Sequence, residues 1–222
     1  MEMTPLFILS IVLSAIVAYL IGSINFALVI SKVFYHKDIR DYGSGNAGMT
    51  NMLRTFGKLP ALFTLIGDLT KGMVAILIAR LLFWLVGGVS QFVLGGYIAG
   101  LCAFLGHVFP IYYGFKGGKG ILVTSGILIM IDPLTFGIIF LIFLIVFIGT
   151  KIISISSISA SIAYPIVTCV TRIIQGYDIT TIVLHTAFSL AIGGLVVYLH
   201  RGNIKRLLAG EEPKIGQKGK MK

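Results

Sequence analysis

The sequence predicts an all-α, polytopic integral membrane protein, and three observations support this fold class. Of its 222 residues, 57% are hydrophobic and 12% are charged, whereas a soluble domain carries roughly 25% charged residues. The mean hydropathy is +0.99. The apolar residues form continuous runs instead of the alternating pattern of a transmembrane β-barrel. We therefore expect a helical bundle in the bilayer, built as a single domain over residues 1–222.

Seven apolar runs are the candidates for membrane-spanning helices. They cover residues 6–30, 59–86, 91–111, 121–131, 134–150, 156–171 and 182–199. A span needs about 20 residues, so two of these runs are short unless flanking residues extend them. The first run is too long for the apolar part of a signal peptide, and Glu2 stands where such a peptide is basic.

The dipeptide Asp132-Pro133 separates two of these runs. Proline interrupts or kinks a helix, so we expect two helices that meet at this turn. A single long helix over 121–150 would reverse the sidedness of every later segment. About seven transmembrane helices are therefore expected.

The basic residues predict the orientation of these helices. The loops 31–58, 112–119 and 151–155 and the tail 200–222 hold nearly all of the lysines and arginines. The positive-inside rule places these segments in the cytoplasm, with the N-terminus outside and a basic cytoplasmic tail. The net charge of +10 then reflects orientation, and no nucleic-acid partner is expected.

Two basic, glycine-rich loops predict a phosphate site. The first loop is Ser44–Asn51, followed by Arg54, and the second loop is Phe115–Gly120. Glycines let backbone N–H groups converge on an anion, and an arginine can hold a phosphate through two hydrogen bonds. The alternatives are a polar turn in which Thr50 or Asn51 caps the next helix, and a flexible basic loop on anionic lipid. The second loop lacks the spacing of a Walker A motif.

Two further polar segments share the predicted cytoplasmic face. These are the serines of 154–157 and the sequence His200 to Asn203. Histidine is a possible general base, whereas serines at the start of a span often cap the helix. Helices that begin on this face would add the positive ends of their dipoles. The convergence of four distant polar segments is the main reason to expect a site there.

Other polar residues in the apolar runs have structural interpretations. Asp68 and Lys71 can share a helix face, and a structural ion pair is preferred to a direct catalytic role. His107 is expected to make an orienting hydrogen bond. Cys102 and Cys169 are interpreted as separate free thiols without metal-ligand spacing. No metal site and no cofactor are expected.

Taken together, these residues resemble the PlsY-type acyl-phosphate:glycerol-3-phosphate acyltransferases. The resemblance extends from about residue 20 to 212 and rests on Gly22-Ser23, Ser44-Gly45-Asn46, Gly48, Thr50-Asn51, Arg54, Asp68, Lys71-Gly72, Gly106-His107, Phe109-Pro110, Phe115–Gly120, Ser154, His200 and Asn203-Ile204. The chain departs from the family pattern at Met49, where alanine is usual, and at Ile121-Leu122-Val123, where valine-alanine is usual.

The resemblance implies seven helices and an active site on the cytoplasmic face of the bacterial inner membrane. It implies transfer of a fatty acyl group from acyl phosphate to the 1-hydroxyl of sn-glycerol 3-phosphate, giving lysophosphatidic acid and inorganic phosphate for phospholipid synthesis. The partners would be the two substrates, the lipid bilayer and, through a functional link, an enzyme that produces acyl phosphate.

The residues expected to act in this site come from all four polar segments. The catalytic residues would be His200, Lys119, Ser154 and Asn203, and the phosphate-binding residues would be Ser44, Asn46, Asn51, Arg54, Lys116 and Lys119. Two alternatives stay open. Either His200 or a substrate phosphate accepts the hydroxyl proton, and any of Ser154, Ser156 and Ser157 can contact the substrate.

Three other functions fit the sequence less well. A phosphate or organophosphate transporter would need polar residues deep in several spans, and apart from Asp68 and Lys71 the runs lack them. A scaffold that binds anionic lipid would not need the glycine pattern. A metal-dependent alcohol phosphotransferase would need a D-x-x-D-x-x-x-D arrangement, but the eight acidic residues are scattered. Acyl-CoA stays open as an alternative donor.

Overall fold

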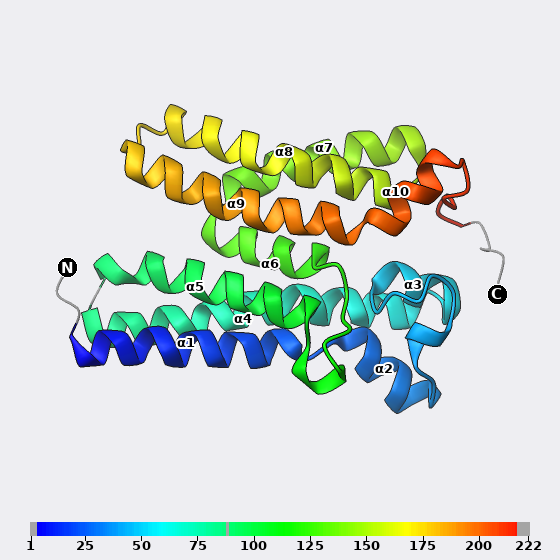
Figure 1. The fold of residues 1–222 in the computed structure, drawn as a ribbon, viewed down its shortest axis with the longest axis horizontal. Helices are drawn as coiled ribbons and strands as arrows, with labels where there is room; N and C mark the ends of the chain where they lie inside the picture. The colour runs from blue at the N-terminus through cyan, green and yellow to red at the C-terminus, as the bar shows by residue number, and fades with distance from the viewer. Residues whose placement is uncertain (1–3, 88, 217–222) are drawn as a thin grey trace. The chain divides into compact units, whose positions relative to one another are not determined.

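The computed structural model describes residues 4–87 and 89–216, and every regular element in these ranges is a helix (Figure 1). In chain order these are α1 (Pro5–Ser23), α2 (Phe26–Tyr35), η1 (Ile39–Asp41), α3 (Met49–Thr55), α4 (Lys58–Gly87), α5 (Val89–Val108), η2 (Ile111–Tyr113), α6 (Ile121–Ile131), α7 (Pro133–Thr150), α8 (Ile153–Ile174), α9 (Ile179–Leu199) and α10 (Arg201–Leu208). The expected all-α class is confirmed.

Six helices of the described ranges are long and apolar enough to cross a membrane. The segments are Pro5–Ser23, Lys58–Leu85, Val93–Tyr113, Pro133–Thr150, Ile153–Ile174 and Ile179–Leu199. The remaining candidate from the sequence, α6, has 11 residues and is shorter than a bilayer span. The number of spans and their orientation stay predictions.

The helical segment is interrupted between α6 and α7, at the position that the sequence predicts. Helix α6 ends at Ile131 and α7 begins at Pro133. Asp132 lies between them and caps α7, because its Oδ1 accepts a hydrogen bond from the backbone N–H of Thr135 over 3.2 Å. Two helices therefore form here, and the alternative of one long helix over 121–150 is wrong.

The expectation that residues 6–30 form one continuous span is wrong. Helix α1 ends at Ser23 and α2 begins at Phe26. Asn25 caps α2, since its Oδ1 accepts from the N–H of Leu28 over 3.0 Å. Its Nδ2 donates to the carbonyl of Ala47 in the first loop over 3.2 Å. The break is set by this capping amide, which carries no charge and lies within an apolar run.

The chain divides into two compact units, which are described separately; the expectation of a single domain stays a prediction. The first unit holds the described residues up to Ile131. In it, α1, α4 and α5 pack side by side (Figure 1). A Cβ on Gly22 would lie 2.2 Å from the carbonyl oxygen of Ala103, and a Cβ on Gly106 would lie 2.3 Å from that of Tyr19. Glycine at these positions lets the backbones of α1 and α5 touch.

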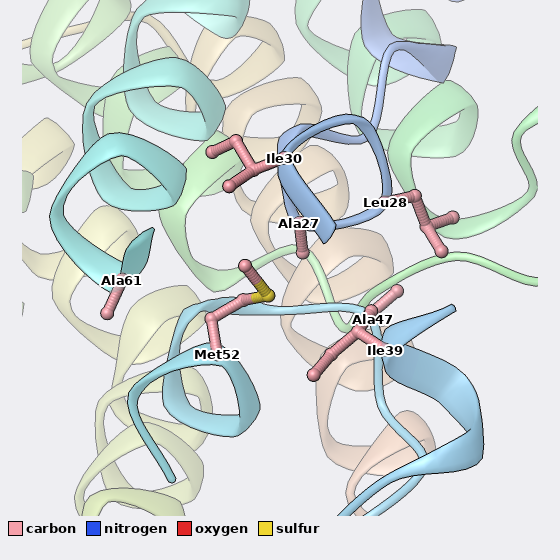
Figure 2. Packing of buried hydrophobic residues seen from close by; sticks show 7 residues of the cluster. All are labelled: Ala27, Leu28, Ile30, Ile39, Ala47, Met52 and Ala61. Atoms are coloured by element: carbon pink, nitrogen blue, oxygen red, sulfur yellow. The ribbon is translucent and has the colours of Figure 1, made fainter. Parts of the chain in front are cut away.

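A small apolar core in the first unit supports the first loop. Figure 2 shows its seven residues, Ala27, Leu28, Ile30, Ile39, Ala47, Met52 and Ala61. They come from α2, η1, the first loop, α3 and the start of α4. Burial of these side chains ties the short elements around the loop to the long helix α4.

The second unit runs from Asp132 to the end of the described chain. Helix α8 packs against both α7 and α9, and α10 contacts α8 and α9. A buried arginine joins the three long helices at one end. Arg172 pairs with Asp132 over 2.6 Å and donates to Nδ1 of His185 over 3.0 Å.

Candidate active site

The buried amide of Asn51 organises the first loop. Its Oδ1 accepts from the backbone N–H of Ser44 over 2.9 Å, and its Nδ2 donates to the carbonyls of Tyr42 and Ile39 over 2.9 and 3.2 Å. An amide offers two N–H donors and one carbonyl acceptor, and here the acceptor binds the backbone of the first loop while the donors bind the backbone just before it. Asn51 therefore fixes the loop, while the side chain of Ser44 is exposed.

The alternative in which Thr50 or Asn51 caps the next helix is wrong. The N-cap of α3 is Gly48, and both residues lie within the first turn of that helix. Asn51 makes its hydrogen bonds back into the loop that precedes it, so it is not available as a cap. Arg54 lies in the last turn of α3 and is half-buried.

The second loop folds back onto the end of α5. The backbone N–H groups of Gly117 and Gly118 donate to the carbonyls of Val108 and His107, each over 3.2 Å. These carbonyls belong to the last turn of α5 and have no partner within that helix. A Cβ on Gly117 would lie 2.0 Å from the carbonyl oxygen of His107. Glycine is required here for close approach.

The expectation that these two glycines offer their N–H groups to an anion is therefore wrong, because the fold already uses them. The basic residues of the second loop remain. Lys116 is exposed, and Lys119 is half-buried, two residues before the start of α6. Gly120, between Lys119 and α6, has a φ of +83° and packs against the ring of Phe104.

An arginine that the sequence analysis did not single out joins the two loop regions. Arg40 donates through Nη1 to the carbonyls of Tyr113 and Lys116 over 3.0 and 3.3 Å. Its Nε and Nη2 bind Asp38 over 2.9 and 2.7 Å. Hydrogen bonding to Arg40 holds the pKa of the Asp38 carboxyl well below its ordinary range. The chain before the first loop is thereby fastened to the second loop.

The expected ion pair of Asp68 and Lys71 is confirmed and is buried. Lys71 Nζ lies 2.8 Å from Asp68 Oδ1 and 2.8 Å from His107 Nδ1. It also donates to the carbonyl of Ile24, at the break between α1 and α2, over 2.7 Å. His107 thus makes the orienting contact that the sequence predicts, and its partner is a charged residue.

Ser154, Ser156 and Ser157 are buried in the first turns of α8. The N-cap of this helix is Ile152, so the expectation that serines cap it is wrong. Ser156 donates to the carbonyl of Ile152 over 2.9 Å. The hydroxyl of Ser154 makes no hydrogen bond within the described residues.

His200 follows α9 and is buried. Its Nδ1 lies 2.8 Å from the carbonyl oxygen of Val196. A carbonyl only accepts, so Nδ1 carries the proton and Nε2 keeps a lone pair in the neutral ring. This tautomer leaves Nε2 suited to accept a hydrogen bond or a proton.

A glutamate in the tail contacts Asn203. Asn203 Nδ2 donates to Glu212 Oε1 over 2.7 Å, and Arg206 Nε donates to Oε2 over 2.6 Å. Burial alone would raise the pKa of Glu212, but hydrogen bonds from Asn203 and Arg206 leave it below the ordinary value. The sequence analysis missed Glu212 because nothing local marks it.

The tail also returns to the turn between α7 and α8. The backbone N–H of Ile215 donates to the carbonyl of Lys151 over 2.8 Å. The amphipathic start of the tail forms α10. The rest of the expected basic tail, residues 217–222, lies outside the described residues, as does Glu2.

The structure thus forms two groups of expected site residues. Six lie in the first unit, on or beside its two loops: Ser44, Asn46, Asn51, Arg54, Lys116 and Lys119. Three lie in the second unit: Ser154, His200 and Asn203. In each unit, tertiary contacts bring distant sequence segments to one end.

Comparisons with known proteins agree with these features. The profile of the glycerol-3-phosphate acyltransferase family matches residues 12–210. A glycerol-3-phosphate acyltransferase of Neisseria meningitidis serogroup A is 40% identical over 205 residues, which cover 91% of this chain and 96% of the relative. One of Cupriavidus metallidurans is 41% identical over 209 residues, covering 94% and 98%.

Two solved structures are also similar. Both are crystal structures of PlsY (YgiH), an integral membrane glycerol 3-phosphate acyltransferase. The glycerol 3-phosphate form has a TM-score of 0.78 at 34% identity, and the lysophosphatidic acid form has a TM-score of 0.75 at 33% identity. Each comparison covers 93% of this chain and 96% of the other.

Proposed function

This chain belongs to the glycerol-3-phosphate acyltransferase family, and we propose that it uses acyl phosphate as the acyl donor. It transfers the acyl group to the 1-hydroxyl of sn-glycerol 3-phosphate and releases lysophosphatidic acid and inorganic phosphate. The observation that carries this proposal is that Arg40, just before the first loop, binds the carbonyl of Lys116 in the second loop, while Asn25 binds the carbonyl of Ala47 in the first loop. Both substrates carry phosphate, and such a joined pair of loops suits two anions.

The roles of the residues follow from their chemistry. Lys119, Lys116 and Arg54 supply positive charge, and Ser44 and Asn46 supply polar groups from the first loop. Asn51 holds the first loop in shape. His200, Asn203 and Ser154 position glycerol 3-phosphate. We place this site at the cytoplasmic face of the bacterial inner membrane, because the basic segments gather there under the positive-inside rule.

The proposed reaction is a direct acyl transfer. The 1-hydroxyl oxygen of glycerol 3-phosphate attacks the acyl carbonyl carbon, and the bond from that carbon to the phosphate oxygen breaks. Phosphate is a good leaving group in a mixed anhydride, so the reaction needs no covalent intermediate on the protein. The main task of the protein is to hold two anions in reactive geometry and to stabilise the charge that develops.

The hydroxyl proton goes to an oxygen of a substrate phosphate or to Nε2 of His200. We favour the phosphate, with His200 and Asn203 as positioning residues. Replacing His200 with alanine then raises mainly the KM for glycerol 3-phosphate. A loss confined to kcat, with a changed pH profile, would identify His200 as the base.

A phosphate-release assay on purified protein in lipid tests the proposal. Palmitoyl phosphate and glycerol 3-phosphate are supplied without added metal, and palmitoyl-CoA replaces palmitoyl phosphate in a parallel reaction. We expect phosphate release that requires both substrates and is lost in Lys119→Ala, while Arg201→Ala, on the exposed start of α10, retains it. Formation of lysophosphatidic acid with palmitoyl-CoA but not with palmitoyl phosphate would overturn acyl phosphate as the donor.

A further inference from the structure

A buried, charged cluster lies beneath the second loop and takes no part in the chemistry described above. Asp68 and Lys71 of α4 and His107 of α5 have exposed fractions of 1%, 4% and 4%. Charged groups within a membrane helix are costly unless they are paired, and where they occur they commonly serve function. The position of the cluster suggests what that function is.

Lys71 uses every donor that it has. Its ammonium group has three N–H bonds, and Nζ lies 2.7 to 2.8 Å from Ile24 O, Asp68 Oδ1 and His107 Nδ1. Lys71 is therefore saturated and has no donor left for a substrate. An ammonium group only donates, so Nδ1 of His107 accepts, and the proton of the neutral ring lies on Nε2.

The Nε2 edge of His107 faces the meeting point of the two loops. A Cβ on Gly118 would lie 2.2 Å from His107 Nε2 and 2.8 Å from the carbonyl oxygen of Ala47. Gly118 therefore lies against both the imidazole and the backbone of the first loop. The N–H of Gly118 donates to the carbonyl of His107, which attaches the second loop to the same residue.

The Asp68–Lys71 pair also holds the other side of this meeting point. Asp68 Oδ1 accepts from the N–H of Phe26 over 3.4 Å, and Lys71 holds the carbonyl of Ile24. Asn25, between them, donates to the carbonyl of Ala47. The same ion pair therefore orients the His107 ring and the Asn25 amide, which touch the second and the first loop.

We propose that His107 is a positioning residue that sets the separation of the two loops. Asp68 and Lys71 fix its tautomer and ring orientation, and its Nε2 edge supports Gly118 against Ala47. This inference rests on the proposed function, since it takes the two loops as the holders of the substrate phosphates. His107 itself does not contact the substrates.

Two substitutions of His107 test the contributions of Nδ1 and Nε2 separately. In His107→Gln the longer amide reaches the Nε2 position, whereas in His107→Asn the shorter amide reaches only the Nδ1 position beside Lys71. We expect His107→Asn to raise the KM for a phosphate-bearing substrate about tenfold with little change in kcat, since loop misplacement weakens binding. His107→Gln stays near the wild-type KM, as does the control His36→Gln, in the exposed residue after α2.

The opposite order, with His107→Asn near wild type and His107→Gln impaired, would show that the ring serves only to satisfy Lys71, and it would overturn the inference. So would wild-type KM values in both variants, or equal losses of kcat with unchanged KM values.

A second measurement keeps the test independent of activity. Nitrogen-15 spectra of histidine-labelled protein in lipid report the tautomer of each ring, and the His107 signal is the one lost in His107→Gln. We expect Nε2–H in the wild type and a loss of this preference in Lys71→Met. Nδ1–H in the wild type would overturn the inference. Absence of phosphate release by the wild type would instead reject the proposed function, while the spectra still test the cluster.

Discussion

The side-chain amide of Asn203 donates to the carboxylate of Glu212 over 2.7 Å, so the orientation of an expected substrate-binding residue is set by the tail of the chain. Both residues are buried. Asn203 lies in α10, and Glu212 lies nine positions further along the chain, after the end of that helix. Arg206 on α10 binds the second carboxylate oxygen. The tail is thus part of the framework around Asn203.

Removal of this carboxylate is expected to destabilise the second unit. Glu212→Ala leaves the buried amide of Asn203 without this acceptor, which costs about 1–3 kcal/mol. Thermal unfolding in lipid or detergent measures the effect, and the KM for glycerol 3-phosphate should rise with it. Glu211→Ala is the matched control, because that neighbouring side chain is exposed. Equal unfolding temperatures for the two variants would contradict the prediction.

The same carboxylate predicts a pH dependence of stability. The pKa of Glu212 is lowered in the folded protein, so its contribution is fully present above the unfolded value of about 4.3. The contribution is lost as the pH falls below that value and through the lower folded pKa. Unfolding temperatures should be insensitive to this group from pH 6 to 8. The decrease in unfolding temperature at acidic pH should be smaller in Glu212→Gln than in the wild type. An equal decrease in that variant would show that other groups cause the loss of stability in acid.

Replacement of Arg40 by lysine is expected to weaken the binding of a phosphate-bearing substrate. Its planar guanidinium binds Asp38 through two nitrogens and reaches two carbonyls with a third, and a lysine ammonium cannot reproduce this geometry. With about 1 kcal/mol assigned to this partly exposed bridge, Arg40→Lys should raise the KM for a phosphate-bearing substrate roughly fivefold.

The control for Arg40 is Lys37→Arg, in a neighbouring exposed residue that stacks over the ring of Tyr42 and is expected to tolerate the exchange. A wild-type KM in Arg40→Lys would show that substrate binding does not depend on the several hydrogen bonds that the guanidinium makes to Asp38 and to the second loop.

The crossing of α1 and α5 predicts the effect of a single methyl group. In Gly106→Ala the new Cβ would lie 2.3 Å from the carbonyl oxygen of Tyr19, and a backbone atom cannot move aside as a side chain can. We expect a loss of at least about 1–3 kcal/mol. Gly194→Ala in α9 is the control, because nothing lies within 4 Å of its Cβ. Similar unfolding temperatures for the two variants would refute the close crossing.

The outcome for individual residues shows how far sequence reasoning reaches. The boundaries of α4 and α6, the break at Asp132 and the pair of Asp68 and Lys71 were predicted, since each depends on neighbours within a few positions. The break at Asn25 was missed, because an uncharged amide within an apolar run gives no signal until its tertiary partner, Ala47, is known.

The glycines of the second loop show most clearly what could not be predicted from the sequence. Sequence alone predicted that their N–H groups face an anion, but in the structure Gly117 and Gly118 cap the end of α5. Arg40 and Glu212 were not singled out, since the partners that connect them to the expected site, Tyr113 and Asn203, lie 73 and 9 positions away and no local pattern indicates these contacts.

By itself, the sequence determined the all-helical class, the membrane location and the family, because hydrophobic runs and short motifs are local properties of the chain. Only the tertiary structure decided which polar groups are already satisfied by the fold. Hydrogen bonding and burial depend on atoms that distant segments bring together, as they do for Lys71, whose three donors meet a helix break, a carboxylate and an imidazole.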